Sequence, residues 1–480
     1  MVFSSYSFIL LFLPVCVAGF YLMKTIGGSG AARHLWELWL LALSVVFYAL
    51  FGWKNLLVLG ISLAFNLCFL LLMNRKKAAV KPLLVTGVLG NIALLSFFKY
   101  GGGVFFPIGI SFYTFAQIDL LADMARGEVR DFSVLDYLTY STYFPKILQG
   151  PITRYSEVTE AFHAVPDKRF DAEEFYRACV LFILALAKKV LIADPVGAAV
   201  DYAYSAPLAL SRPDVFIAVL LYPVQLYMDF SSCCEMGMAA SQMMGIPLPV
   251  NFDSPYQTTS IPEYWRRWHM TLTRFFTDNI YIPLGGSRKG TARTYFNVMI
   301  IFLVSGLWHG TGWTFFIWGL LHGVFSVIVR AFRTARKRRG FVPGQESRAV
   351  HRLLIAGNYL VISALFILFR SASLQDAGTM VHQIICGDAQ FTAGFVKNFG
   401  WKELIYALKF TPWAYSPYRF DLCMWFVVVC SMLLIFVCPG AVRIARKVRI
   451  APFPTILLGI LLAWSICSLG GVKSYIYFQF

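Results

Sequence analysis

Long apolar runs recur along the whole chain and constrain its fold more than any other feature. Nine of them are 15–18 residues long, close to what an α-helix needs to cross a hydrocarbon core of roughly 30 Å. They are Phe8–Met23, Leu35–Leu50, Leu56–Met73, Leu83–Phe98, Val215–Phe230, Trp313–Val329, Leu353–Phe369, Leu422–Val437 and Thr455–Leu469. Only 14% of the residues are charged, against roughly 25% in soluble domains. The sequence therefore predicts an all-α polytopic membrane protein.

Four further apolar segments are shorter or are interrupted by proline and glycine, and they leave the number of spans between residues 100 and 300 open. They are Val104–Ala122, Tyr137–Gly150, Tyr176–Ala193 and Tyr295–Trp308. The first run, Phe8–Met23, lacks a basic leader, so we expect a retained span and not a signal peptide. No internal repeat divides the chain, and we expect one integral membrane domain over residues 1–480 with an aromatic tail at 471–480.

The formal net charge is +17, and the positions of the basic residues decide what this charge means. A basic chain can bind nucleic acid, but here Lys and Arg cluster at the ends of apolar runs, at 75–81, 330–352 and 443–449. Such clusters are typical of cytoplasmic loops. We therefore expect contact with membrane lipid and no nucleic-acid partner. Counting spans from the clusters places both termini, and the stretch 371–420, outside the cytoplasm.

A polar and aromatic segment at 251–290 interrupts the apolar pattern. Pro262 is a favoured first-turn residue, and we expect a helix from there to about Asn279. An apolar face is predicted because bulky side chains recur on this helix at three- and four-residue intervals. These side chains are Trp265, Trp268, Leu272, Phe275 and Phe276. The same helix carries Arg266, Arg267 and Arg274, which are candidates for binding phosphate groups, with His269 among them.

A helix break is predicted after the run Tyr295–Trp308. A helix of that length rises only about 21 Å before Gly310-Thr311-Gly312 interrupts it. Non-helical backbone at membrane depth is tolerated only beside protein or a water-filled cavity. His309 lies at the break and His322 on the following helix. Ionisable residues at bilayer depth are costly and are typical of functional sites.

Three histidines, His269, His309 and His322, are therefore the candidate functional residues. Imidazole titrates near neutrality, so it can take a proton from a hydroxyl and return it to a leaving group. The residues alone leave another interpretation open, in which a ring, above all that of His322, only forms an interhelical hydrogen bond. We expect no metal site, because the histidines lack HxxxH or HExxH spacing and the ten cysteines lack CxxC spacing.

Four segments resemble motifs of the membrane-bound O-acyltransferase family. They are FPIGISFYTF (106–115), FPKILQGPI (144–152), PEYWRRWHMTLTRFF (262–276) and GLWHGTGWTFFIWGLLHG (306–323). The resemblance covers nearly the whole chain in matching order, and the RWH and WHG motifs are specific. The sequence most resembles the bacterial branch, the membrane subunits of alginate and peptidoglycan O-acetylation and of lipoteichoic acid D-alanylation.

The resemblance implies a fold and roles for the three histidines. The fold would be a ring of about 11–13 transmembrane and re-entrant helices around a central funnel, with the acyl donor entering from the cytoplasm and the acceptor from outside. His309, in the WHG motif, would be the catalytic histidine. His269, in the RWH motif, would occupy the second active-site position. His322 is frequent in the bacterial branch and ranks third.

The extreme C-terminus, YIYFQF (475–480), resembles the aromatic ending of a small partner subunit in D-alanylation systems, whose tyrosine is thought to carry the acyl group. By this resemblance Tyr477 would be acylated at His309 and would pass the group on. The other interpretation of the same residues is an aromatic belt at the membrane interface.

The function expected from these observations is the transfer of an acetyl or other small acyl group from cytoplasmic acetyl-CoA, across a bacterial inner membrane, for O-acetylation of an extracytoplasmic polysaccharide. We expect Arg266, Arg267 and Trp308 to contact acetyl-CoA, although interfacial anchoring explains the two arginines as well. No cofactor is expected. A periplasmic SGNH-type acetyltransferase or the glycan acceptor is the expected partner. A proton-coupled transporter or channel, and a structural scaffold, are the rival functions.

Overall fold

The structure is a computed structural model that describes residues 1–27, 34–75, 79–101, 105–129, 131–339, 347–399 and 401–471. The described part is helical and holds no β-strand, so the prediction of an all-α protein is confirmed. The first helices are α1 (Leu13–Gly27), α2 (Leu35–Ala49), α3 (Trp53–Arg75), α4 (Val80–Tyr100), α5 (Ile110–Arg126), α6 (Val134–Thr142), α7 (Phe144–Ile147), α8 (Tyr155–Ala164), α9 (Ala172–Ala187), α10 (Asp194–Ser205) and α11 (Arg212–Met243).

The second half of the chain contains α12 (Ile261–Tyr264), α13 (Met270–Phe276), α14 (Thr291–His309), α15 (Trp313–Arg338), α16 (Arg348–Arg370), α17 (Leu374–Cys386), α18 (Ala393–Lys397), α19 (Lys402–Leu408), α20 (Arg419–Phe436), α21 (Ala441–Lys447) and α22 (Pro452–Cys467). Short π-helical and 3₁₀ segments are η1 (Phe8–Phe12), η4 (Lys188–Ala193), η5 (Pro207–Ala209), η6 (Thr277–Tyr281), η7 (Pro412–Tyr415) and η8 (Ser468–Gly471).

Eight helices of the described ranges are long and apolar enough to cross a membrane. They contain eight of the nine predicted long runs, and the ninth forms α2, which is shorter at 15 residues. Polytopic membrane organisation is thereby confirmed. The interrupted segments form α5, the pair α6 and α7, α9 with η4, and α14. Helix α14 has 19 residues, because it begins at Thr291 and not at Tyr295 as the sequence predicted. The prediction of one domain over the whole chain stays a prediction.

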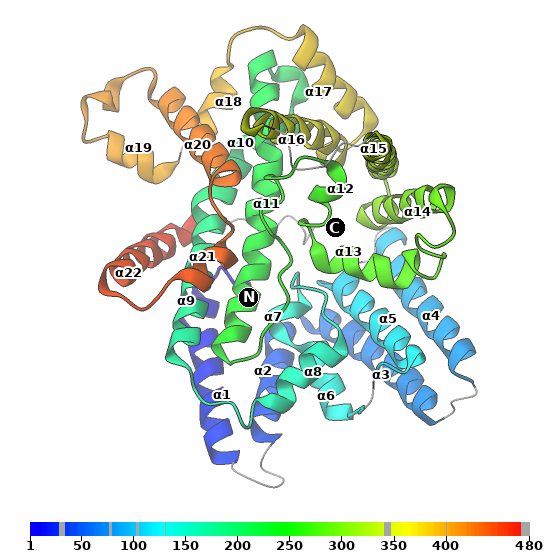
Figure 1. The fold of residues 1–480 in the computed structure, drawn as a ribbon. Coiled ribbons are helices and arrows are strands. Elements are labelled where there is room, and N and C mark those ends of the chain that lie inside the picture. Colours follow the sequence, from blue (N-terminus) through cyan, green and yellow to red (C-terminus); the bar gives the residue numbers. More distant parts are fainter. Residues whose placement is uncertain are drawn as a thin grey trace.

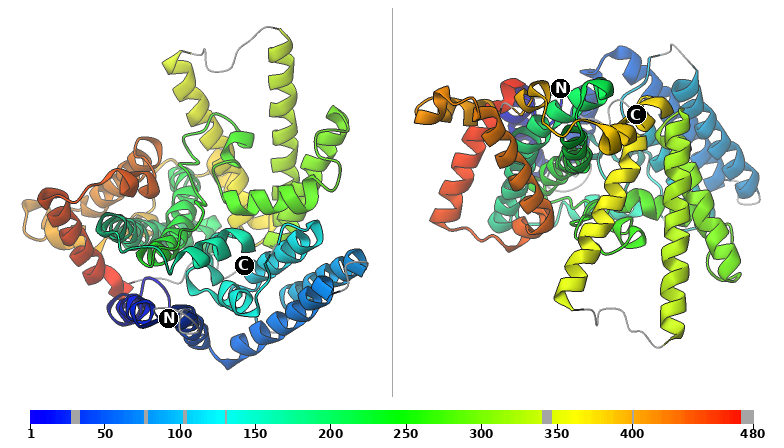
Figure 2. Two further views of the ribbon diagram at one scale, coloured as in Figure 1. Left: turned by 60° about the horizontal axis from the view of Figure 1, so that its bottom comes forward. Right: turned by 90° about the horizontal axis from the view of Figure 1, so that it is seen from above.

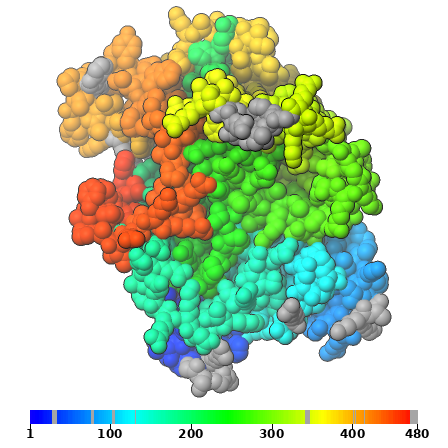
Figure 3. All heavy atoms as spheres, in the orientation of Figure 1, coloured from blue at the N-terminus to red at the C-terminus, as the bar shows by residue number. Residues whose placement is uncertain are grey.

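Helix α11 lies in the middle of the molecule, where it runs vertically in Figure 1. It contacts elements from both halves of the chain, namely α7, α9, α10, η4, α16, α17 and α20. Of its most apolar 18-residue stretch, 89% is buried inside the protein, against 11% for α4 and for α22. Figure 3 shows the blue and cyan N-terminal helices at the bottom and the orange and red C-terminal helices to the left. The outer helices therefore surround α11.

Two hydrophobic clusters form the core, and α11 belongs to both. One cluster gathers α1, α2 and α6 to α9 around the C-terminal part of α11, including Met236 and Ala240. The other gathers α10, α13, α16 and α20 around its N-terminal part, including Tyr222 and Phe230. The central helix thus joins the two clusters into one body.

A buried lysine and a half-buried lysine hold η4 against α11. Lys189 Nζ lies 2.6 Å from Asp229 Oδ1 and 2.9 Å from Asp194 Oδ1, and Lys188 Nζ lies 2.7 Å from Glu235 Oε2. Burying a charge without a partner is strongly unfavourable, whereas a hydrogen-bonded pair is tolerated. The segment Tyr176–Ala193 is mostly apolar in the sequence, and these ion pairs explain how it can contain Lys188 and Lys189.

Helices α14 and α15 pack closely because glycine replaces larger side chains where they cross. A Cβ on Gly306 would lie 2.6 Å from Phe315 O, and a Cβ on Gly319 would collide with Phe302 O. Small residues allow membrane helices to approach at the backbone. Beyond this crossing, α15 and α16 extend away from the rest of the molecule as a pair, as Figure 2 shows. The crossing of α14 and α15 fixes the positions of His309, at the end of α14, and of His322, in α15.

Candidate active site

The predicted helix break after residue 308 is present, and it places His309 at a helix end. Helix α14 ends at His309, Gly310 is extended with φ −169° and ψ 169°, and α15 begins at Trp313. His309 is 3% exposed. Its ring lies among three aromatic rings, at centroid distances of 4.4 Å from Trp308, 5.2 Å from Trp318 and 5.0 Å from Phe369. The imidazole is therefore held in a dry, aromatic environment.

The last turn of α14 is fastened to α4. Lys99 donates through Nζ to the carbonyl of Trp308, and its ammonium lies 5.5 Å from the centroid of the Trp308 ring. Tyr100 Oη donates to the carbonyl of Leu307 at 2.6 Å. The last carbonyls of a helix lack partners within the helix, and a cation there is favourable. Lys99 and Tyr100 therefore hold the turn that carries His309.

His269 lies at a break in the predicted helix from Pro262 to Asn279, so that prediction was wrong. Helix α12 ends at Tyr264, α13 begins at Met270, and His269 between them has φ 45° and ψ 52°. This left-handed conformation is unfavourable for a residue other than glycine. Asn251, 18 positions before His269, compensates for it. Its carbonyl accepts from Met270 N at 2.9 Å and its side-chain oxygen accepts from Thr271 N at 3.2 Å. A distant residue thereby caps the new helix.

The predicted apolar face survives the break. Trp268, Leu272, Phe275 and Phe276 are buried. Trp265 is half-buried and contacts His322, because its indole Nε1 donates to His322 Nδ1 at 3.2 Å. His322 itself is fully buried, with ring centroids 5.2 Å from Trp265 and 4.8 Å from Trp318. The hydrogen bond from Trp265 thus gives His322 the interhelical contact that the sequence left open.

Two tryptophans connect the three histidines. The Trp308 ring lies 6.5 Å from His269 and 4.4 Å from His309, and the Trp318 ring lies 5.2 Å from His309 and 4.8 Å from His322. The structure therefore brings together all three histidines that the sequence singled out, from α13, α14 and α15.

The other two motifs meet the same site. Phe112, in the segment 106–115, stacks on His269 at 6.2 Å. In the segment 144–152, Ile152 N donates to Thr271 Oγ1 at 3.0 Å, and Gln149 O accepts from Cys234 Sγ at 2.9 Å. Four motifs that are far apart in the sequence therefore surround one cluster of histidines.

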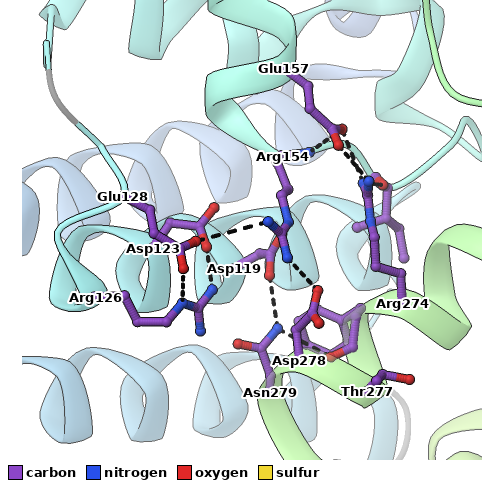
Figure 4. A network of polar contacts seen from close by, with 12 residues as sticks. Asp119, Asp123, Arg126, Glu128, Arg154, Glu157, Arg274, Thr277, Asp278 and Asn279 are labelled. Carbon is purple, nitrogen blue, oxygen red and sulfur yellow. Dashed lines mark hydrogen bonds and ion pairs between the residues drawn. The ribbon is translucent and has the colours of Figure 1, made fainter. Parts of the chain in front are cut away.

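A network of charged and polar side chains fixes α13 and η6 against α5 and α8 (Figure 4). Arg274 Nη1 lies 2.5 Å from Glu157 Oε1, and Arg154 Nη2 lies 2.5 Å from Asp278 Oδ2. Asn279 Nδ2 donates to Asp119 Oδ1 at 2.8 Å. This network pairs Arg274 with a carboxylate, and the prediction that Arg274 binds a phosphate group stays a prediction.

A pocket of about 290 Å³ lies between α12, α13, α14 and α15. Arg266 and Arg330 line it, and Ser305, one helical turn before His309, lines it as well. Ser326 also lines the pocket, and its buried hydroxyl has no hydrogen-bond partner among the described residues. The lining further includes Trp265, Phe276, Tyr281, Ile301 and Phe302. A ligand here would contact Trp265, the partner of His322, whereas the His309 ring is packed behind the lining.

The residues expected to contact the acyl donor take different positions. Arg266 is exposed and lines the pocket. Arg267 is paired with Glu263 at 2.8 Å and is not a lining residue. Trp308 packs against His309 and is not a lining residue of the pocket. Tyr477 lies outside the described residues. In the ranges that the structure describes, no group of three or more His, Cys, Asp or Glu side chains could hold a metal ion.

Two site residues were missed by reasoning from the sequence. Lys99 follows an apolar run, which made it resemble an ordinary anchor at the membrane interface. Asn251 begins the polar segment, and its contact with His269 crosses 18 positions without any helical spacing. The presence of Asn251 in the same polar segment as His269 was the only local indication of its role.

Comparison with known proteins identifies the class. The chain matches the family model of the membrane-bound O-acyltransferase family over residues 40–371. It is 32% identical to the peptidoglycan O-acetyltransferase of Helicobacter pylori over 78% of each chain. It is also 32% identical to the probable alginate O-acetylase of Pseudomonas aeruginosa, over 79% of this chain and 74% of that one. The teichoic acid D-alanyltransferase of Streptococcus thermophilus is 27% identical over 56% of this chain and 69% of its own.

The chain belongs to the membrane-bound O-acyltransferase family. It is therefore an acyltransferase of the membrane, similar to enzymes named for the modification of peptidoglycan and alginate. This assignment sets aside the transporter and the scaffold as rival functions of the chain.

Proposed function

We propose that the protein transfers an acetyl group from acetyl-CoA, bound at the cytoplasmic face of a bacterial inner membrane, towards an extracytoplasmic polysaccharide. Two relatives at 32% identity are named for the O-acetylation of peptidoglycan and of alginate, which supports a glycan acceptor. The observation that carries the proposal is the pocket that extends from Arg266 and Arg330 to Ser305, one turn from His309.

The basic residues of α15 and α16 support the orientation. Arg330 lines the pocket and begins the cluster 330–352, which the positive-inside tendency assigns to the cytoplasm. The pocket would then open to the cytoplasm, with Arg266 and Arg330 next to the CoA phosphates. Both chain termini would lie outside, and lipid would surround the outer helices.

The size of the pocket supports a small acyl group. Ligand pockets for drug-sized molecules are about 300–1,000 Å³, and this pocket, at about 290 Å³, lies just below the lower limit. The volume suits an acetyl thioester and the end of its pantetheine arm better than a long fatty acyl chain.

The transfer would proceed at the histidine cluster. A hydroxyl oxygen attacks the thioester carbonyl carbon, a C–O bond forms, the C–S bond breaks, and the hydroxyl proton passes through imidazole to the departing thiolate. The products are an O-acetyl ester and CoA with a free thiol. Activation of a hydroxyl by an adjacent base is the usual requirement for such an attack. His309 is proposed as this base because it ends α14 one helical turn after Ser305, which lines the pocket.

In one form of the proposal the attacking hydroxyl is that of Tyr477, which would act as a relay for the acetyl group. The acylated tyrosine would then present its group to a periplasmic SGNH-type acetyltransferase, which would complete the transfer to the glycan.

Purified protein incubated with labelled acetyl-CoA tests the acyl-transfer proposal. We expect thioester turnover by the wild type and a fall of about 10²–10⁴-fold in His309→Ala, since general base catalysis contributes that much. His382→Ala is the matched control, because His382 is exposed on α17. An unchanged rate in His309→Ala, or turnover of a D-alanyl donor but not of acetyl-CoA, would contradict the proposal.

Mass spectrometry of the C-terminal peptide tests the relay. We expect an acetyl group on Tyr477 in wild-type protein after exposure to acetyl-CoA, and loss of acceptor acetylation in Tyr477→Phe. Tyr475→Phe lies two residues away and should keep acceptor acetylation. Undiminished acceptor acetylation in Tyr477→Phe would rule out the relay and leave direct transfer.

A further inference from the structure

Two side chains next to the histidine cluster determine which ring nitrogen carries the proton. We propose that Asn251 and Trp265 hold His269 and His322 in opposite neutral tautomers, so that Nε2 of His269 accepts a hydrogen bond and Nε2 of His322 donates one. The inference rests on the proposed acyl transfer at this site, and it assigns Asn251 and Trp265 as positioning residues.

The side-chain amide of Asn251 can be oriented in only one way. Its Oδ1 accepts from Thr271 N at 3.2 Å and from Thr271 Oγ1 at 2.9 Å, and its Nδ2 donates to Cys234 Sγ at 3.3 Å. A backbone N–H can only donate, so a flipped amide would place two donors against each other. The atom that faces Thr271 is therefore the oxygen.

The tautomer of His269 follows from this orientation. His269 Nδ1 lies 3.3 Å from Asn251 Oδ1. An amide oxygen only accepts hydrogen bonds, so Nδ1 must carry the proton and Nε2 has the free lone pair. His269 Nε2 is buried and has no hydrogen-bond partner among the described residues. Buried polar atoms are nearly always paired, so this lone pair is positioned to accept a proton or a hydrogen bond from a ligand.

His322 has the reverse arrangement. The indole Nε1 of Trp265 lies 3.2 Å from His322 Nδ1, and an indole N–H only donates. Nδ1 of His322 must therefore be the acceptor, which places the proton on Nε2. His322 Nε2 is also buried and lacks a partner in the described part of the chain. It is a preformed donor in a dry site.

The two tautomers divide the work of acyl transfer. His322 can donate a hydrogen bond to the thioester carbonyl oxygen, on which negative charge develops. His269 Nε2 can accept a hydrogen bond from a donor group of the bound substrate, which leaves the proton of the attacking hydroxyl to His309. The rings of Trp308 and Trp318 place His309 between these two imidazoles. Because Trp265 also lines the pocket, a bound acyl donor would lie against the residue that sets the His322 tautomer.

Nitrogen-15 NMR of full-length protein labelled at histidine tests the tautomers directly. His269→Gln and His322→Gln identify the two sets of signals. At neutral pH we expect wild-type His269 to show protonated Nδ1 and unprotonated Nε2, and His322 to show the reverse. Trp265→Phe keeps a ring but removes the N–H, so both tautomers of His322 should appear while His269 is unchanged. A wild-type His269 protonated at Nε2, or a His322 protonated at Nδ1, would overturn the inference.

A pair of Asn251 variants adds a kinetic test that a purely structural role would not satisfy. Asn251→Asp keeps an acceptor for His269 Nδ1 and Asn251→Leu removes it at similar size. We expect Asn251→Leu to mix the His269 tautomers and to lower kcat about 100-fold with little change in KM for acetyl-CoA, and Asn251→Asp to retain the tautomer and most of kcat. Equal loss of kcat in the two variants with an unmixed His269 tautomer would contradict the inference.

The NMR result does not depend on turnover, so the two proposals fail separately. The stated tautomers in a protein that does not turn over acetyl-CoA would refute only the proposed function. Reversed tautomers in an active enzyme would refute only this inference. Detergent-solubilised variants that elute as a single species and unfold at the wild-type temperature establish that each substitution leaves the fold intact.

Discussion

His269 shows how one residue can serve both the backbone and the chemistry of a site. Its φ of 45° turns the chain between α12 and α13, which carries its ring away from the predicted helical face and towards Trp308. A left-handed conformation costs roughly 1–2 kcal/mol for a residue with a side chain. The hydrogen bonds from Met270 N and Thr271 N to Asn251 offset that cost. The position of the ring therefore depends on backbone contacts with Asn251 as well as on the contacts of the ring itself.

Glycine and alanine substitutions at His269 separate the effect of the backbone conformation from the effect of the imidazole ring. Both remove the imidazole, but only glycine adopts a positive φ without penalty. We expect His269→Gly to be more stable than His269→Ala by about 1 kcal/mol, the opposite of the order in an ordinary helix, and both to be inactive. Thermal unfolding in detergent measures the difference. An alanine variant more stable than the glycine variant would show that the strain is absent.

At the scale of elements, the crossing of α14 and α15 determines the geometry of the site. Gly306 and Gly319 leave no room for a Cβ at the crossing, so the two helix axes are fixed by backbone contact. His309 and His322 each follow one of these glycines by three residues, and both rings lie against Trp318. The spacing between the two imidazoles is thereby set by glycine and by one buried tryptophan.

Gly319→Ala should therefore disturb both stability and activity. The added methyl group collides with Phe302 O, so the helices must separate. Overpacking of this kind costs about 1–3 kcal/mol, and we expect acetyl transfer to fall by about 10-fold or more, since misplacement of about 1 Å can cost 10²-fold. Gly357→Ala in α16 is the control, because a Cβ there meets nothing within 4 Å. An equal loss of stability and activity in both variants would show that close packing at the crossing is not the cause.

At the scale of the whole molecule, the site forms where segments from distant parts of the chain meet beside α11. The segments 106–115 and 144–152 approach from one side, and α14 to α16 from the other. Figure 1 shows this arrangement, with α13 and α14 on the opposite side of α11 from α21 and α22. The protruding ends of α15 and α16 carry the basic cluster that is expected to mark the cytoplasmic face.

Cysteine labelling from each side of the membrane tests this orientation. Lys337 lies on the protruding end of α15 and Gln375 lies on α17, and both side chains are exposed. Helix α16 connects the two regions and is long enough to cross the bilayer once. In a background without native cysteines, we expect Lys337→Cys to react only from the cytoplasm and Gln375→Cys only from outside. Labelling of both from the same side would refute the topology.

Much of the fold and part of the site could be predicted from the sequence. The long runs became helices that can span a membrane, and the break at Gly310-Thr311-Gly312 is present. The prediction of a continuous helix from Pro262 to Asn279 was wrong. Helical periodicity shows which side chains share a face, but it cannot reveal a turn that a residue outside the helix, Asn251, stabilises. The ion pair of Arg274 with Glu157 could not be predicted, because the two residues lie 117 positions apart.

The sequence by itself determined the membrane-embedded helices, the helix break and the identity of the three histidines, since hydropathy, glycine and residue type act locally. Only the tertiary structure decided that His269 is held by Asn251, that Trp265 donates to His322, and that Lys99 fastens the turn before His309 across 209 positions. Such contacts depend on which helices pack against each other, and this is determined by how the outer helices pack around α11.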